Sequence, residues 1–217
     1  MAGAVIGAIA NLIHPRSDAV ATAQGVADLA AGSDIWTFDH YLIAWSAALG
    51  GLGILALCRS LVEEPARSWG WIASLFTVGS VTVAYLFAAI DGTVLKEAAD
   101  AGGSEAVAVA HVASGLFTAL MGSLFGVVPV LIGIALLSTT QYPRWLGTVA
   151  LVSGVIGLFT SSYQYLVGYE PVVSNYLFTL GSVGTTVVLF AAGWFLWKGE
   201  YAGVATAPVA GGPGITT

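Results

Sequence analysis

Charged side chains are scarce in this sequence. Asp, Glu, Lys and Arg make up 8% of the 217 residues, whereas hydrophobic residues make up 57% and the mean hydropathy is +0.88. A water-soluble domain normally carries about 25% charged residues, so this chain has too few to cover a water-facing surface. The sequence therefore predicts a protein of the lipid bilayer, and its length suits one compact helical domain.

Basic residues and cysteine are scarce as well. Six Lys and Arg stand against twelve Asp and Glu, a net charge of -6, so no basic patch exists to bind nucleic acid. The single Cys58 excludes an internal disulfide and a Cys/His zinc motif. Neither a Ser-His-Asp nor a Cys-His arrangement is recognisable. No nucleophile is assigned, and a non-catalytic role is favoured.

Five stretches contain no Asp, Glu, Lys or Arg and are long enough to cross a bilayer as helices, which takes roughly 20 apolar residues. They are Tyr41 to Cys58, Trp69 to Ile90, Thr118 to Leu137, Trp145 to Leu166 and Tyr176 to Trp197. Met1 to Ile13 is apolar but too short to span. We expect it to be a short helix packed on its neighbours, or the outer part of a spanning helix that starts upstream. The predicted fold is an all-α membrane bundle over residues 1–198, with six helices in total.

The loop charges predict the orientation of this bundle, because Lys and Arg are retained on the cytoplasmic side. The loops and helix ends on one side contain Arg59, Arg67, Arg144 and Lys198, and those on the other side contain only Arg16 and Lys96. We therefore expect both termini to be cytoplasmic in a cell membrane. The predicted outer loops, residues 14–39, 91–105 and 167–175, are acidic.

Two further segments have a distinctive composition. Residues 199–217 are rich in Gly, Ala, Pro and Thr, which is typical of a flexible tail, here on the cytoplasmic side. Within the first outer loop, Ala19 to Ala31 consists mainly of small residues. It is expected either to form a short surface helix or to be disordered.

A long helix is predicted from Glu105 to Ser138, interrupted only by Pro129. Several of its residues fall near one line on the helix, namely His111, Gly115, Gly122, Gly126, Pro129 and Gly133. Gly122 and Gly126 form a GxxxG motif, which lets another helix approach closely. We place this helix at the bundle centre or at a contact with a partner. The leading hypothesis is a non-catalytic accessory or structural subunit, in contact with membrane lipids and with other membrane proteins or a second copy of itself.

All three histidines map to the predicted outer end. His14 ends the first helix, His40 begins the next beside Asp39, and His111 lies in the first turns of the long helix, with Asp91 nearby. If helices pack in sequence order, these five residues converge. Imidazoles and carboxylates are ligands that a metal ion would use, and two of the histidines could instead hold a haem. The competing interpretation makes His14 and Asp39 helix-end caps, and His40 and His111 interfacial polar residues.

A second candidate site lies near the end of the fourth spanning stretch, where Tyr163, Gln164 and Tyr165 cluster. They would line a pocket for a quinone, a carotenoid or another lipophilic ligand. The alternative is an aromatic belt that anchors the helix at the membrane interface. At membrane depth the polar groups are hydroxyls and amides. Since ion and proton pathways usually need an ionisable group there, a proton-coupled transporter is disfavoured.

Overall fold

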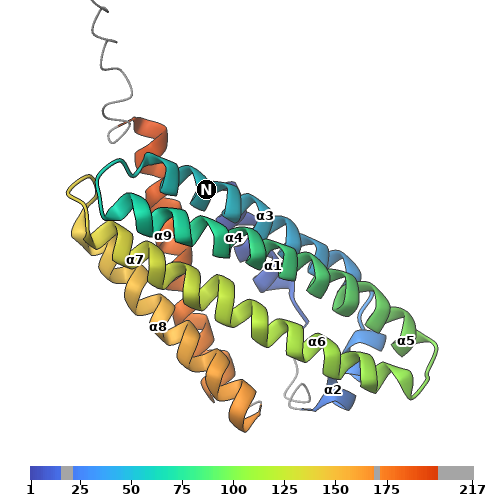
Figure 1. Ribbon diagram of the computed structural model, residues 1–217. Coiled ribbons are helices and arrows are strands. Elements are labelled where there is room, and N and C mark those ends of the chain that lie inside the picture. The colour runs from blue at the N-terminus through green and yellow to red at the C-terminus, as the bar shows by residue number, and fades with distance from the viewer. Residues whose placement is uncertain (16–21, 169–171, 200–217) are drawn as a thin grey trace, which may run out of the picture.

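The computed structural model describes residues 1–15, 22–168 and 172–199, and these residues form helices and their connections, without strands (Figure 1). Among these described residues, five helices are long and apolar enough to cross a membrane, and a shorter apolar helix precedes them. The prediction of an all-α membrane bundle is therefore confirmed. The predicted tail lies outside the described residues, apart from Gly199, which ends the last helix in a left-handed conformation.

The five candidate spans are α3 (Trp36–Ser60), the continuous segment Ala66–Asp100, the continuous segment Glu105–Leu137, α8 (Arg144–Val167) and α9 (Phe178–Lys198). The second span consists of α4 (Ala66–Ala89), the π-helical turn η2 (Ile90–Leu95) and α5 (Lys96–Asp100). The third consists of α6 (Glu105–Gly122), the π-helical turn η3 (Ser123–Val127) and α7 (Val128–Leu137). The remaining elements are α1 (Ala2–Ile13), α2 (Ala23–Ala31) and η4 (Val172–Leu177).

These boundaries agree with the predicted spans, with one difference of note. The long helix from Glu105 is present and ends at Leu137, whereas the span expected to end at Ile90 continues to Asp100. Asp91 therefore does not close the helix but lies inside it, in η2. Of the segment of small residues in the first outer loop, Ala23–Ala31 forms α2, whose first turn is capped by the Thr22 side chain accepting from the Gly25 N–H. Residues 19–21 of that segment lie outside the described residues.

The long helices pack in sequence order into a closed bundle. α3 packs on α4, α4 on α7, α7 on α8 and α8 on α9, and α9 returns beside α3. Figure 1 shows α6 and α7 running as one long helix across the bundle, with α3 and α4 on one side, α8 on the other and α9 passing behind. α1 packs against α3 on the edge that faces α9.

Glycine brings α8 unusually close to η3 and α7, the elements that precede it in the chain. A Cβ on Gly157 would lie 2.1 Å from the backbone carbonyl oxygen of Phe125, and one on Gly154 would lie 2.6 Å from the backbone N of Val130. Pro129 has no N–H to offer the Phe125 carbonyl four residues before it. That carbonyl instead lies against the bare backbone of α8, so this interface depends on the absence of side chains.

The GxxxG pair also lies against α8. A Cβ on Gly122 would lie 2.6 Å from the Ser161 hydroxyl oxygen, and one on Gly126 would lie 2.9 Å from a methyl carbon of Leu158. The Ser161 hydroxyl donates to the Thr118 carbonyl, at 2.9 Å. α8 of the same chain therefore covers these two glycines.

α1 covers only part of the groove between α3 and α9. Its 12 residues extend about 18 Å, whereas a bilayer core is about 30 Å thick. The Ser46 hydroxyl donates to the Gly3 carbonyl at 2.9 Å, so the start of α1 lies near the middle of α3. Beyond Met1 the groove continues as a cavity of about 180 Å³, lined mainly by small residues and leucines of α3 and α9.

The two ends of the bundle differ in charge. The loop after α3 meets the loop before α8, where the Thr139 hydroxyl donates to Glu63 at 2.6 Å. Arg59, Arg67 and Arg144 belong to helix ends at this Glu63 end. His14 and His40 lie at the opposite end, which we call the histidine end. That the histidine end faces away from the cytoplasm stays a prediction from the loop charges.

Candidate metal site

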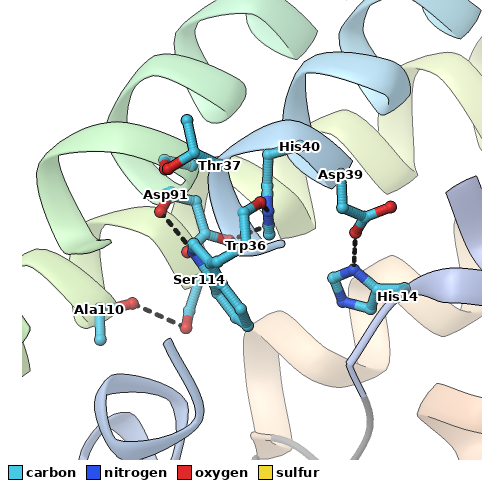
Figure 2. A network of polar contacts seen from close by, with 9 residues as sticks. His14, Trp36, Thr37, Asp39, His40, Asp91, Ala110 and Ser114 are labelled. Atoms are coloured by element: carbon cyan, nitrogen blue, oxygen red, sulfur yellow. Dashed lines mark hydrogen bonds and ion pairs between the residues drawn. The ribbon is translucent and has the colours of Figure 1, made fainter. Parts of the chain in front are cut away.

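Three elements bring polar side chains together at the histidine end (Figure 2). His14 ends α1, Asp39 and His40 lie in the first turns of α3, and Asp91 lies in η2. Neighbouring positions on a helix differ by about 100°, so Asp39 and His40 face different partners. Asp39 faces α1, and His40 faces η2.

His14, Asp39 and His40 form a compact group. Each offers one atom able to bind a metal ion, and these atoms all lie within 4.8 Å of one another. His14 Nδ1 and Asp39 Oδ2 are joined by a hydrogen bond. The imidazole rings of His14 and His40 meet edge to face, with centroids 5.3 Å apart.

Hydrogen bonds define the orientation of His40. Its Nδ1 lies 2.8 Å from the Trp36 carbonyl oxygen, and its Nε2 lies 3.1 Å from Asp91 Oδ2. A carbonyl oxygen only accepts hydrogen bonds, so Nδ1 carries a proton. Nε2 lies beside a carboxylate, so a proton on Nε2 would donate to Asp91. A metal ion on His40 would take the place of that proton on Nε2, while Nδ1 keeps its bond to the carbonyl, the arrangement found in protein-bound metal sites.

The π-helical turn η2 presents Asp91 to His40. The Trp36 indole N–H donates to the Asp91 carbonyl at 2.7 Å, and the Thr37 hydroxyl donates to the Gly92 carbonyl at 2.5 Å. These bonds tie η2 to the start of α3. Gly92 lets the two segments approach, because a Cβ there would lie only 2.6 Å from the His40 Cβ. Such π-helical turns occur frequently at functional sites.

Apolar groups enclose most of the site. Trp36 and Phe87 lie beside the His40 ring, with centroid distances of 4.6 and 5.4 Å. Around Trp36 a buried cluster from α2, η2 and α6 contains Ala27, Ala30, Leu95, Ala106 and Ala110. The side chains of Asp39 and His40 are 0% and 1% exposed, whereas that of His14 is 33% exposed. Within the described residues, His14 is therefore the member of the group that solvent reaches.

Both carboxylates of the site are buried with unused hydrogen-bonding capacity. Asp39 Oδ1 and Asp91 Oδ1 have no hydrogen-bond partner among the described residues. The ion pairs found there join these carboxylates only to His14 and His40, and not to lysine or arginine. A buried charge is costly unless it is paired and hydrogen-bonded. When the two histidines are neutral, as they are on a metal ion, the two carboxylates leave negative charge that a bound cation would neutralise.

The other candidate residues lie elsewhere. His111 is exposed on α6 and does not belong to the group. Tyr165 is 83% exposed, and Tyr163 stacks on Phe159 with a centroid distance of 6.1 Å. The cavity between α3 and α9 is not lined by Tyr163, Gln164 or Tyr165, so a lipophilic ligand at these residues stays a prediction.

Several residues of the site were not anticipated from the sequence, and Trp36 and Gly92 are two of them. Trp36 precedes His40 by one helical turn, a spacing that places a carbonyl and an aromatic ring beside the histidine. That spacing is visible in the sequence and would have pointed to Trp36. Gly92 has no comparable signal, because its importance depends on how closely η2 approaches α3.

The chain matches no known family model, no curated protein and no solved structure. Its chemistry is therefore inferred from the arrangement itself. Two imidazoles and a carboxylate suit Zn²⁺ and other first-row transition-metal ions. Because metal–ligand bonds are about 2.0–2.2 Å long, ligand atoms on one ion lie roughly 3–4 Å apart. Modest side-chain rotations would bring the present group to that spacing.

Proposed function

We propose that this multi-pass membrane protein binds one transition-metal dication at the histidine end of its bundle. The observation that carries the proposal is the convergence of ligand atoms from His14, Asp39 and His40 within 4.8 Å, although His14 is distant from the others in the sequence. The hydrogen bond of His40 to the Trp36 carbonyl supports it, because that bond occupies Nδ1 and turns Nε2 toward Asp91, where an ion could replace the proton on Nε2.

The arrangement favours an ion over a haem. Two axial histidines would have to point at one iron from opposite faces of a flat macrocycle. Here the two imidazole rings contact each other edge to face, and Trp36 and Phe87 lie beside the His40 ring. This packing offers no flat slot between the imidazoles.

The surroundings favour binding over conduction. Below His40, Phe87 belongs to a buried apolar cluster with Ala47, Ala84, Leu120 and Leu124. An ion that enters beside the partly exposed His14 would meet hydrocarbon beyond the site. The ion would leave by the route it entered, since moving it into an apolar interior is very costly.

The role of an accessory subunit in a membrane complex stays a prediction. Three glycines of the stripe that motivated it, Gly122, Gly126 and Gly133, pack on α8 of the same chain, so they give it no support. Purification in a mild detergent tests it directly. Protein chains that copurify in fixed ratio would support an accessory role, whereas an isolated monomer would count against it.

The metal-binding proposal is tested by titrating the purified full chain with Co²⁺ and recording its visible absorption. The wild-type protein is expected to bind one Co²⁺. His14→Gln and His40→Gln remove a ligand, and each should weaken binding by more than the roughly 10–100-fold typical of residues outside the ligand set. His111→Gln, at the exposed histidine of α6, is the matched control and should bind like the wild type.

Three results would contradict the proposal. The first is wild-type protein that binds no Co²⁺ or Zn²⁺, and the second is ligand variants that bind as well as the wild type. The third is an equal loss in the His111→Gln control. Size-exclusion profiles and thermal unfolding of each variant in the same detergent separate a lost ligand from a lost fold.

A further inference from the structure

Asp91 stands apart from the three converging residues but faces the same site. Its Oδ2 lies 3.1 Å from His40 Nε2, the nitrogen assigned to the ion, and its Oδ1 is buried without a partner among the described residues. The Asp91 side chain is 9% exposed. The carboxylate is therefore within reach of an ion on His40, and one of its two oxygens has no donor among the described residues.

The backbone holds Asp91 in this position. The Trp36 indole bonds its carbonyl, and the Thr37 hydroxyl bonds the next carbonyl along the chain. Both donors come from the first turns of α3, which also carries His40. Such preorganisation is typical of a group whose placement matters for binding.

The charges of the site distinguish dications from monocations. Metal-bound histidines are neutral, so His14 and His40 contribute no charge and the two carboxylates contribute two negative charges. A dication would be balanced by Asp39 and Asp91, whereas a monocation would leave one buried carboxylate uncompensated. In a weakly polarisable environment an uncompensated charge is strongly unfavourable.

We propose that Asp91 makes this site selective for dications over monocations by supplying its second negative charge. This inference rests on the proposed metal-binding function. It assigns Asp91 a role in selectivity that differs from simple support of the His40 ring. If Asp91 only positioned His40, its loss would weaken the binding of every ion that uses His40.

The test compares Co²⁺ with Ag⁺, a monovalent ion that also binds imidazole nitrogen. All proteins carry Cys58→Ser, so that the single thiol does not bind Ag⁺. Asp91→Asn removes the charge with little change of shape, and Asp91→Glu keeps the charge. Asp28→Asn, which removes an exposed carboxylate on α2, is the control for charge at this end of the protein.

The parent protein should bind Co²⁺ at least about tenfold more tightly than Ag⁺. Asp91→Asn should weaken Co²⁺ binding by roughly 10–100-fold and change Ag⁺ binding by less than about threefold. Asp91→Glu and Asp28→Asn should keep the preference for Co²⁺.

Equal weakening of both ions in Asp91→Asn would overturn the inference and make Asp91 a positioning residue. Unchanged Co²⁺ binding in Asp91→Asn would overturn it as well. If Asp91→Asn does not fold, the parent protein alone still tests the inference. A parent protein that binds Ag⁺ as tightly as Co²⁺ would contradict it. Failure of the proposed function is distinct, since the parent would then bind no Co²⁺ at all.

Discussion

Carboxylates at the two ends of the bundle have different surroundings. At one end, Glu63 is exposed and accepts from the hydroxyl of Thr139 and from the backbone N–H of Thr140, at 2.6 and 3.2 Å. At the other end, Asp39 and Asp91 are buried, and each has an oxygen without a partner among the described residues.

This difference separates a structural role from a binding role. The hydrogen bond from Thr139, with that from the Thr140 backbone, lowers the pKa of Glu63, so its charge is stabilised by the protein itself. Glu63 joins two loops, and its charge is stabilised without a bound cation. Each buried carboxylate of the histidine end has a histidine beside one oxygen and no donor for the other among the described residues, so it is better suited to hold a cation. Residue type alone does not distinguish the two cases.

Among substitutions that compare the two ends, Gly92→Ala at the histidine end is expected to have the largest effect on Co²⁺ affinity and on stability. The added Cβ would lie 2.6 Å from the His40 Cβ, so η2 and α3 have to separate. Overpacking of this kind costs about 1–3 kcal/mol. Displacement of His40 from Asp91 should also weaken Co²⁺ binding by about tenfold or more, because tenfold corresponds to only about 1.4 kcal/mol.

Gly115→Ala is the matched control for this test. A Cβ at Gly115 meets nothing within 4 Å, so the same substitution is made in α6 without a clash. It should leave Co²⁺ binding unchanged and slightly raise the unfolding temperature. Similar behaviour of the two variants in titration and thermal unfolding would mean that η2 does not control the site.

A smaller effect is expected for Trp36→Phe. This change keeps an aromatic ring beside His40 but removes the N–H that donates to the Asp91 carbonyl at 2.7 Å. A buried acceptor left without its donor costs about 1–3 kcal/mol. We expect a lower unfolding temperature and a severalfold weaker affinity for Co²⁺. Unaltered affinity would show that this bond stabilises the fold without positioning Asp91.

The smallest effect is expected for Glu63→Gln, at the opposite end. The variant should bind Co²⁺ like the wild type and unfold at a slightly lower temperature near neutral pH, because its neutral amide accepts weaker hydrogen bonds. The lowered pKa of Glu63 gives the sign of the pH dependence. Its stabilisation is present above the ordinary carboxyl range and is lost as pH falls through the lowered pKa.

Thermal unfolding of the wild type and Glu63→Gln across a pH series checks this prediction. The difference between the two proteins should be constant near neutral pH and disappear in acid, where Glu63 is protonated. A difference that grows in acid would contradict the assignment. A change in Co²⁺ affinity would contradict the separation of roles between the two ends.

Much of the histidine end could be predicted from helix order. His14, His40 and Asp91 end or begin neighbouring apolar stretches, and sequential helices that pack side by side bring such ends together. What helix order does not provide is the direction of each side chain around its helix. For His111, the direction of the side chain determines that it lies outside the metal-binding group.

The position of His111 follows from the buried face of α6. Ala106, Ala110 and Ala113 are buried, and they define the side of the helix that faces the bundle. His111 directly follows Ala110, so it is rotated by about 100° and points outward. The sequence contains this pattern of small residues, but small residues also occur on lipid-facing surfaces, so the buried side was visible only after packing.

Composition alone established that this chain belongs in a bilayer, because so few charges leave a water-facing surface uncovered. It also established the long helices, since a backbone in hydrocarbon has to satisfy its own hydrogen bonds. The tertiary structure decided which polar residues meet. His14 lies against Asp39 because the short α1 packs on α3. Asp91 lies against His40 because η2 turns Asp91 toward α3. These are contacts between distant segments, and they depend on close approach rather than on any local pattern of residues.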